Sequence, residues 1–267
     1  MNILIKLKLL ATALLACVLT LIPQSGLGQI VVESGAHIVV TGAPKVVLKD
    51  IRLEMSGTMA PGSSEVFVRG NGTAMQSALA GLSTVILHEL TVDHSNGGLQ
   101  LETTAEVNSR LRFVQGDLEL NSQIVDLGNS GFLMGENEQR RAKGVAGGQL
   151  VTRRLFNAPA AFNAGNIGLA VTSSSNMGMC TIKRGHKPYA NVVAGRSGID
   201  RYFEITPSTS GAPATLRFYY FDVENSPAYP EAALTLFNSP DGGTTWIPVG
   251  KANQDTTADW VEQSGLD

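Results

Sequence analysis

Two pairs of carboxylates at alternate positions have a spacing that could support catalysis or metal binding. One pair is Asp117 and Glu119, and a second is Asp222 and Glu224. Because alternate residues of a strand point from the same face, each pair sets two carboxylates side by side. Glycosidases use two carboxylates about 5–10 Å apart, and Ca²⁺ binds hard oxygen ligands. Solvent-facing strands carry the same pattern, so we expect no metal, with a structural calcium at Asp222, Glu224 and Asp241 as the alternative.

Histidine and cysteine give no further reactive motif. Cys180 is the one cysteine outside residues 1–28, and we expect it to be buried in a strand over 177–182 rather than to act as a nucleophile. We expect Arg184-Gly185-His186 to form a polar turn after that strand, with His186 as a base or ligand as the alternative. The histidines show no H-x-H or H-x-x-x-H spacing, so we expect no zinc. They are His37, His88, His94 and His186. We expect no catalytic residue and no cofactor.

The segment Ser239–Trp246 fits the Asp-box pattern, S-x-D-x-G-x-T-W. Its fixed positions are Ser239, Asp241, Gly243, Thr245 and Trp246. The Asp241 carboxylate can accept hydrogen bonds from turn amides, and Gly243 can adopt a positive φ. Trp246 can pack back onto the hairpin. The box resembles those of sialidases and of many unrelated β-proteins, in which it is a turn rather than the active site, so we expect a structural turn.

In the first half of the chain, short apolar triplets indicate the strands that would position any reactive side chains. Each places two apolar side chains on one face of a strand of three to five residues, and glycines beside Asn or Ser separate them. Apolar residues at helical spacing do not extend beyond one turn, so we expect an all-β fold. The triplets are Ile38/Val40, Val46/Leu48, Ile51/Leu53, Val66/Val68, Val85/Leu87, Leu90/Val92, Leu99/Leu101, Leu111/Phe113 and Leu118/Leu120.

Residues 29–135 are best explained by an irregular parallel β-solenoid, which is β-helix-like. Each rung of such a fold buries few apolar residues against its neighbours. The triplets are separated by about six to nineteen residues, so no strict repeat is present. An antiparallel sandwich is the alternative, but these gaps vary too widely for regular hairpins.

Residues 150–267 are expected to form an antiparallel β-sandwich, and residues 136–149, polar and glycine-bearing, the boundary before it. Alternation within Ile199–Trp246 carries this prediction, for example at Phe203 and Ile205. The chain ends on the polar segment WVEQSGLD, where one more strand is expected. We therefore expect the sandwich to be incomplete at the C-terminus and the chain to be a fragment.

Residues 1–28 have the features of an export signal: a basic start, the uncharged apolar run Leu9–Ile22 and small residues before Gln29. The run is shorter than the roughly 20 residues of a membrane span. We expect cleavage near Gly28/Gln29, a secreted or cell-surface location, and no span in the mature chain. Lipid attachment at Cys17 is the alternative, and it fits less well because the apolar run continues past the cysteine.

The charge of the expected mature chain disfavours polyanionic partners. Removing Lys6 and Lys8 lowers the basic residues from 20 to 18 against 23 acidic residues, which gives a net charge of −5. Nucleic acids and anionic membranes need a concentrated basic surface, so we expect neither as a partner.

An ordered set of segments between residues 116 and 246 resembles exported surface proteins of the Bacteroidota. The segments are GDLELNSQIVDLG, NAGNIGLAVTSSSNMGMCTIKRGH, IDRYFEITP, ATLRFYYFDVE and SPDGGTTW. The resemblance implies a cell-surface location, a modular non-catalytic role and export by the type IX system. Such proteins carry a C-terminal sorting domain, and we expect the sequence that ends at Asp267 to depart from this pattern by not including one.

Together these features favour a non-enzymatic exported protein of structural or adhesion type, a spacer with a display module. Its expected partners are other cell-envelope or extracellular modules, and glycans. One alternative is a carbohydrate-binding module that stacks sugars on Trp246, Tyr219 and Tyr220. A β-helix polysaccharide lyase or hydrolase is the other alternative, but it needs clustered charges on one solenoid face, and those of residues 30–135 are scattered.

Overall fold

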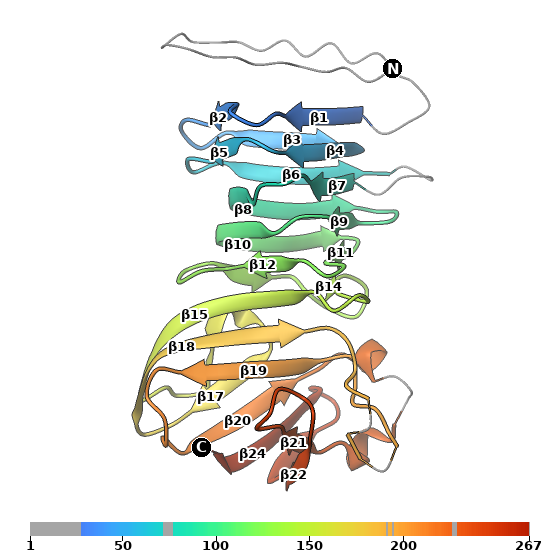
Figure 1. Cartoon of the computed structure of the whole chain (residues 1–267). Helices are drawn as coiled ribbons and strands as arrows, with labels where there is room; N and C mark the ends of the chain where they lie inside the picture. The colour runs from blue at the N-terminus through green and yellow to red at the C-terminus, as the bar shows by residue number, and fades with distance from the viewer. Residues whose placement is uncertain (1–27, 72–76, 191, 194, 226–228, 267) are drawn as a thin grey trace.

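The computed structural model describes residues 28–71, 77–190, 192–193, 195–225 and 229–266 (Figure 1). Apart from Gly28, the expected signal segment therefore lies outside the described residues. Strands account for 54% of the structure and helices for 4%, so the expected all-β class is confirmed. In the part that is described, no helix has both the length and the apolar character needed to cross a membrane.

The first half of the chain is a parallel β-solenoid of about five turns, as the short triplets predict. Figure 1 shows its rungs stacked one below another from β1 downwards. All pairings among its strands are parallel, which rules out the antiparallel alternative for this region. One parallel sheet contains β1 (Gly28–Val32), β4 (Ile51–Met55), β7 (Ser77–Ala80), β9 (Leu99–Leu101), β11 (Leu118–Glu119) and β14 (Ala142–Lys143).

A second sheet forms the opposite wall of the solenoid. Its parallel strands are β3 (Lys45–Lys49), β6 (Glu65–Gly70), β8 (Val85–His94), β10 (Ala105–Gln115), β12 (Ile124–Asp126) and β15 (Gln149–Asn157). The strand β13 (Phe132–Met134) also pairs with β10. A short third sheet joins β2 (His37–Val39) to β5 (Thr58–Ala60).

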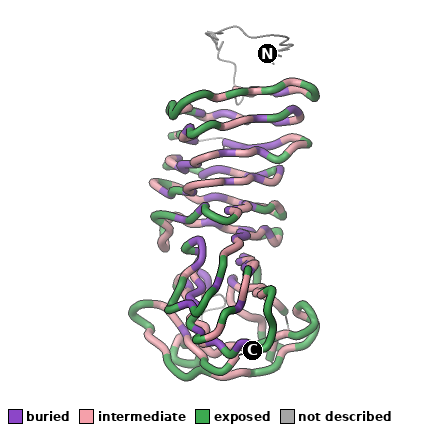
Figure 2. The backbone as a smooth tube through the Cα atoms, turned by 90° about the vertical axis from the view of Figure 1, so that its left-hand side faces the viewer, coloured by how far each residue is buried: buried purple, intermediate pink, exposed green. Residues whose placement is uncertain are grey.

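Aligned aliphatic side chains fill the interior between these walls. Val66, Leu90, Leu111 and Leu133 occupy matched positions on β6, β8, β10 and β13, and each is at most 2% exposed. Figure 2 shows buried segments recurring from rung to rung along the stack. Because every rung buries its apolar residues against the next, burial of each Leu contributes about 1.5–3 kcal/mol without one deep core.

Glycine is required where neighbouring rungs approach most closely. Gly98 has a φ of +73°, and a Cβ there would lie 2.1 Å from the Asp117 carbonyl oxygen of the next rung. A larger residue would force the rungs apart. Gly98, one of the glycines between the triplets, therefore marks a corner between two rungs.

The solenoid sheet changes from parallel to antiparallel at its end. The strand β15 pairs antiparallel with β18 (Asn176–Gly185), which pairs antiparallel with β19 (Tyr202–Pro207). The expected boundary at 136–149 therefore needs correction, because β14 lies within this segment and β15 begins at its end, and both belong to the parallel sheets. Backbone hydrogen bonds place β14 and β15 in the parallel sheets, and the polar sequence around these strands does not reveal that pairing.

A separate antiparallel sheet completes the terminal unit. It contains β16 (Phe162–Asn163), β17 (Leu169–Thr172), β20 (Ala214–Tyr219), β24 (Trp260–Leu266) and β23 (Asn253–Asp255). The hairpin of β21 (Leu236–Asn238) and β22 (Ile247–Gly250) lies beside it. The described residues also form the short 3₁₀ helices η1 (Ala164–Asn166), η2 (Asp222–Glu224) and η3 (Glu231–Ala233). The rings of Phe203 on β19 and Phe218 on β20 meet edge to face at 4.8 Å, so the two sheets are in contact there.

Candidate functional site

The Asp-box forms a self-contained turn between β21 and β22. Asp241 Oδ1 accepts hydrogen bonds from the amides of Thr244 and Thr245 at 3.1 and 2.8 Å, and Oδ2 accepts one from the Thr245 hydroxyl at 2.7 Å. The Ser239 hydroxyl donates to Oδ1 at 2.9 Å. These bonds to the charged form, led by the Thr245 amide, lower the pKa of Asp241 to about 2. Gly243 has the expected positive φ, +95°. Asp241 is thus used within its own turn.

Trp246 contacts Tyr189, a residue of the loop after β18, beyond its own hairpin. The two ring centroids are 4.9 Å apart at 60°, and Tyr189 meets Tyr202 at 4.7 Å and 67°. The Trp246 indole nitrogen is buried and has no hydrogen-bond partner among the described residues. All three residues are among those that line one cavity.

The cavity lies between β19, β20 and the β21–β22 hairpin and has a volume of about 1020 Å³. Apolar side chains dominate its lining, including Met177, Ile205, Leu216, Phe218 and Leu236. From the sequence we expect no pocket in which reactive groups converge; that expectation concerns reactive side chains and sets no limit on an apolar cavity such as this one. His186 does not line it.

The three proposed stacking residues do not share one platform. Trp246 and Tyr220 line the cavity, and Tyr219 does not. Neighbouring residues of an extended chain point to opposite faces, so the Tyr219 and Tyr220 side chains diverge. Tyr219 is paired with Trp260 of β24, whereas Tyr220 is only 2% exposed. The Trp260 ring carries the Arg217 guanidinium 4.0 Å from its centroid.

Arg184 and His186 belong to a buried polar network, which corrects the expected polar turn. The strand β18 continues to Gly185, and the Arg184 side chain is 1% exposed. Arg184 donates two hydrogen bonds to Glu136 at 2.6 and 2.8 Å and one from Nε to His186 Nε2 at 3.1 Å. His186 Nδ1 lies 3.1 Å from the Gly148 carbonyl oxygen. The sequence suggested a turn because the partner Glu136 is distant along the chain.

Protonation in this network follows from burial and from Arg184. Burial alone would raise the pKa of Glu136, but the Arg184 charge and hydrogen bonds outweigh it and hold this pKa at about 2. Burial, together with the Arg184 charge, lowers the pKa of His186 well below 6.5. His186 is therefore neutral, donating from Nδ1 to Gly148 and accepting at Nε2 from Arg184. Both ring nitrogens are engaged in structural bonds.

The carboxylate pairs of the sequence are also used locally. Asp117 Oδ2 lies 2.5 Å from the Lys143 ammonium, and Glu119 Oε1 accepts the Asn121 amide at 2.9 Å. Glu224 is on η2 rather than on a strand, and it binds the Arg201 guanidinium at 2.7 Å with both side chains buried. These pairs therefore do not present two free carboxylates to a substrate.

Cys180 is 1% exposed on β18, and burial raises the pKa of its thiol. A buried thiol of raised pKa is a poor nucleophile, because the thiolate is the reactive form. Its position agrees with the expected role as a small apolar residue.

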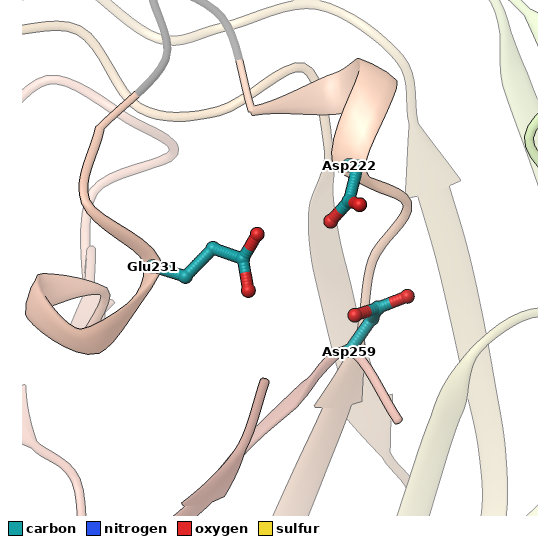
Figure 3. Close-up of side chains that lie close together, drawn as sticks. All are labelled: Asp222, Glu231 and Asp259. Atoms are coloured by element: carbon teal, nitrogen blue, oxygen red, sulfur yellow. The ribbon is translucent and has the colours of Figure 1, made fainter. Parts of the chain in front are cut away.

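One group of acidic residues in the described chain has the spacing of a cation site: Asp222, Glu231 and Asp259. One carboxylate oxygen of each lies within 4.8 Å of the others. Figure 3 shows the Asp222 and Asp259 carboxylates near one another, with Glu231 extended toward the same space. We call these three residues the acidic cluster. Of the calcium ligands considered from the sequence, only Asp222 belongs to it. Glu224 and Asp241 are engaged elsewhere, and the sequence does not connect Glu231 or Asp259 to Asp222.

Comparison with known proteins adds no assignment. The chain matches no protein-family model, and comparisons with curated proteins and with solved structures give no significant match. The class that the geometry defines is an all-β protein built on a parallel β-solenoid.

Proposed function

We propose that this protein is a non-enzymatic, exported structural or adhesion-type protein in which the solenoid is a spacer and the terminal unit is a display module. The observation that carries the proposal is the unbroken hydrogen-bonded sheet from β3 to β19. Stacked rungs with short-range contacts give a stiff, elongated body, which suits a spacer.

The connection between spacer and display module supports this role. The strands β15 and β18 pair from Gln149↔Gly185 to Asn157↔Asn176, so the terminal unit begins as an extension of the solenoid sheet. The buried Arg184–Glu136 pair fastens the same junction, and Glu138 accepts hydrogen bonds from the Asp222 and Val223 amides at 2.9 and 3.2 Å. A junction made from strands and buried polar bonds keeps the module at a fixed orientation.

We interpret the terminal unit as an antiparallel β-sandwich. One layer is β15–β18–β19, shared with the solenoid, and the other contains β17, β20 and β24. Contact between Phe203 and Phe218 supports this interpretation, and the large apolar space between the layers indicates a loosely filled core.

Export to the cell surface is part of the proposal. It is supported by the signal features of residues 1–28 and by the resemblance of residues 116–246 to surface proteins of the Bacteroidota that use type IX secretion. The partners would be other cell-envelope or extracellular modules.

Surface labelling tests this proposal directly. Cells that express the full chain with an internal tag would be treated with a membrane-impermeant biotin reagent. We expect the tagged protein to be labelled on intact cells, and its new N-terminus to lie near Gln29. Recovery of unlabelled protein with residues 1–28 intact in the cytoplasm would contradict export. Hydrolysis or elimination of any member of a polysaccharide panel would contradict the non-enzymatic assignment.

A carbohydrate-binding module is the second candidate, and the contacting rings of Trp246, Tyr189 and Tyr202 in the cavity lining favour it. Aromatic rings that line an open space can stack on sugar faces. A glycan array with the wild type and Trp246→Ala would decide. Binding that is lost in Trp246→Ala supports this candidate, and absence of wild-type binding removes it.

A further inference from the structure

The strand β19 is the last strand of the sheet that continues from the solenoid (Figure 1). One of its edges pairs antiparallel with β18, from Gly185↔Tyr202 to Cys180↔Pro207. The other edge has no neighbouring strand among the residues that the structure describes. Such an edge presents unpaired N–H and C=O groups to whatever lies beside it.

The register shows which backbone groups of β19 are unpaired. In an antiparallel pair, residues alternate between those bonded to the partner strand and those that face away from it. The Ser208 amide donates to the Met179 carbonyl oxygen at 2.9 Å, so Glu204, four residues earlier in the same register, also faces β18. Phe203 and Ile205 alternate with these positions. Their amides and carbonyl oxygens therefore face away from β18, toward the free edge.

The free edge borders the apolar cavity of about 1020 Å³. Phe203 and Ile205 line it, together with Leu216 of β20 and Leu236 of β21. These four side chains are only partly buried, whereas the solenoid residue Leu111 is fully buried. The volume lies at the upper end of the range of about 300–1,000 Å³ that is typical of ligand pockets. The space is therefore large enough for an occupant that covers these apolar side chains.

A second free strand edge borders the same cavity. The strand β21 pairs with β22 on one side, and in the described part of the chain no strand pairs with its other side. All three residues of β21, Leu236, Phe237 and Asn238, line the cavity. The strands β19 and β21 are not paired with each other. The cavity therefore lies between two strand edges, where one further strand could form backbone hydrogen bonds.

We propose that this cavity binds an extended segment of a partner protein, which pairs with the free edge of β19 and carries apolar side chains at alternate positions. The segment would bond to the free backbone groups of Phe203 and Ile205. Phe203 points toward the second layer, where its ring meets Phe218, so side chains in register with it would fill the cavity. The intervening side chains would face outward, as Tyr202 and Glu204 do where they bond to Gln149.

Polar groups in the lining favour a polypeptide over an alkyl chain. The Trp246 indole nitrogen is buried without a partner among the described residues, and a backbone carbonyl oxygen can accept a hydrogen bond from it. Arg196, in the loop that leads into β19, also lines the cavity. Arg201 pairs with Glu224, whereas Arg196 forms no ion pair within the described chain. Its charge is complementary to an acidic residue at one end of the partner segment.

This inference deepens the proposed function, because it names the chemistry of the partner that a display module would hold. It rests on that function only for the place where the two proteins meet. Binding of a peptide by the purified protein does not depend on export. A failure of surface labelling would therefore remove export and leave peptide binding intact, and a failure of peptide binding would leave export intact.

The test uses the full chain and blocked synthetic peptides in which valine and threonine alternate, with glutamate at one end or the other. Amide exchange of Phe203 and Ile205, measured by NMR, is the readout. We expect about 1 mM peptide to slow exchange of both amides at least tenfold, which corresponds to a Kd of about 0.1 mM or tighter. The Glu204 amide, which is already bonded to β18, is expected to change little.

Modified peptides separate strand pairing from apolar filling. One control has the same composition with its valines in a single block, which removes the alternation. Two others keep the alternating sequence and carry N-methyl groups on the valines or on the threonines, which removes backbone donors toward one edge at a time. All three are expected to protect the Phe203 and Ile205 amides at least tenfold less than the parent peptide. These controls use the wild-type protein and do not depend on a variant that folds.

Variants of the protein locate the groove. Ile205→Pro removes a free amide without removing a bond to β18, and proline is tolerated where its nitrogen faces away from the sheet. We expect this variant to remain folded in urea titrations and to lose at least tenfold in peptide affinity. Ile205→Val retains the amide and is the matched control, with affinity like that of the wild type. Arg196→Gln is expected to weaken binding of the acidic peptide severalfold, but not of the peptide with glutamine in place of glutamate.

The proposal is overturned if none of the alternating peptides slows exchange of the Phe203 and Ile205 amides. It is also overturned if the blocked-valine and N-methylated peptides protect these amides as well as the parent peptide does, since apolar filling alone would then explain binding. A long-chain fatty acid that binds in the cavity when the peptides do not would assign the cavity to a lipid and contradict strand pairing.

Discussion

Arg184 of β18 and Glu136 of the loop between β13 and β14 form a two-point ion pair, with side chains only 1% and 9% exposed. The pair crosses the junction between the solenoid and the terminal unit. Glu136 Oε1 also accepts the Ala142 amide at 2.9 Å, so one carboxylate satisfies donors on both sides. The junction therefore depends on a polar contact as well as on strand pairing.

Removing the charge of Glu136 should destabilise this junction strongly. We expect Glu136→Gln to lower the free energy of unfolding by about 3–5 kcal/mol, because Arg184 would remain buried without its counter-ion. Equilibrium unfolding in urea measures the change. Lys183→Gln is the matched control, since the neighbouring Lys183–Glu204 pair is 40% exposed on both sides and should contribute less than about 1 kcal/mol. Equal losses in the two variants would contradict the role of burial.

The same carboxylate predicts a loss of stability in acid. The folded-state pKa of Glu136, about 2, lies below its usual value of 4.5. The stabilisation is therefore complete above about pH 4.5 and is lost as the pH falls toward 2, by about 3 kcal/mol in total. Unfolding curves between pH 6 and pH 2.5 should show a smaller decline for Glu136→Gln than for the wild type. Parallel curves would show that Glu136 does not carry this pH dependence.

Truncation within the solenoid ladder should be costly for a different reason. Leu111 is fully buried between Leu90 and Leu133 of neighbouring strands. We expect Leu111→Ala to lower the free energy of unfolding by about 2–5 kcal/mol, through lost burial and the cavity that it leaves. Val47→Ala is the control, because Val47 is 51% exposed, and its effect should stay within about 0.5 kcal/mol. A comparable effect of both variants would mean that Leu111 does not face the interior.

Asp241 should control local order in the Asp-box turn. Asp241→Ala removes the acceptor of the Thr244 and Thr245 amides. We expect hydrogen–deuterium exchange of these two amides to accelerate at least tenfold, with exchange in β18 unchanged. Asn238→Ala, at the exposed edge of the same hairpin, should leave the two amides as protected as in the wild type. Unchanged protection in Asp241→Ala would show that the turn is held by other contacts.

The solenoid could be predicted from the sequence because the residues that stabilise each rung lie close together along the chain and form a local apolar pattern. Two inward residues per strand, such as Val66 and Val68, are what a thin rung needs, and the glycine at Gly98 marks a corner. The end of the solenoid could not be placed in the same way. The parallel pairing of β14 and β15 depends on backbone hydrogen bonds, and buried side chains such as Ala142, Leu150 and Val151 do not by themselves show the direction of that pairing.

The candidate sites were harder to predict, because they depend on contacts between distant residues. Arg184 looks like a surface cation unless Glu136 is known to lie against it. Asp222 was recognised, but Glu231 and Asp259 reach it only through the folding of three loops. The Asp-box is the opposite case, since all its bonds lie between Ser239 and Thr245 and a local pattern is enough.

The reversal of strand direction at β15 also limits self-association. A parallel stack ends in unpaired backbone groups onto which a rung from another molecule could add, as happens in fibres. Here β18 occupies that edge of β15 along almost its whole length, and β19 follows it. The number of rungs is thereby fixed on this side, and end-to-end growth of the molecule through β15 is blocked.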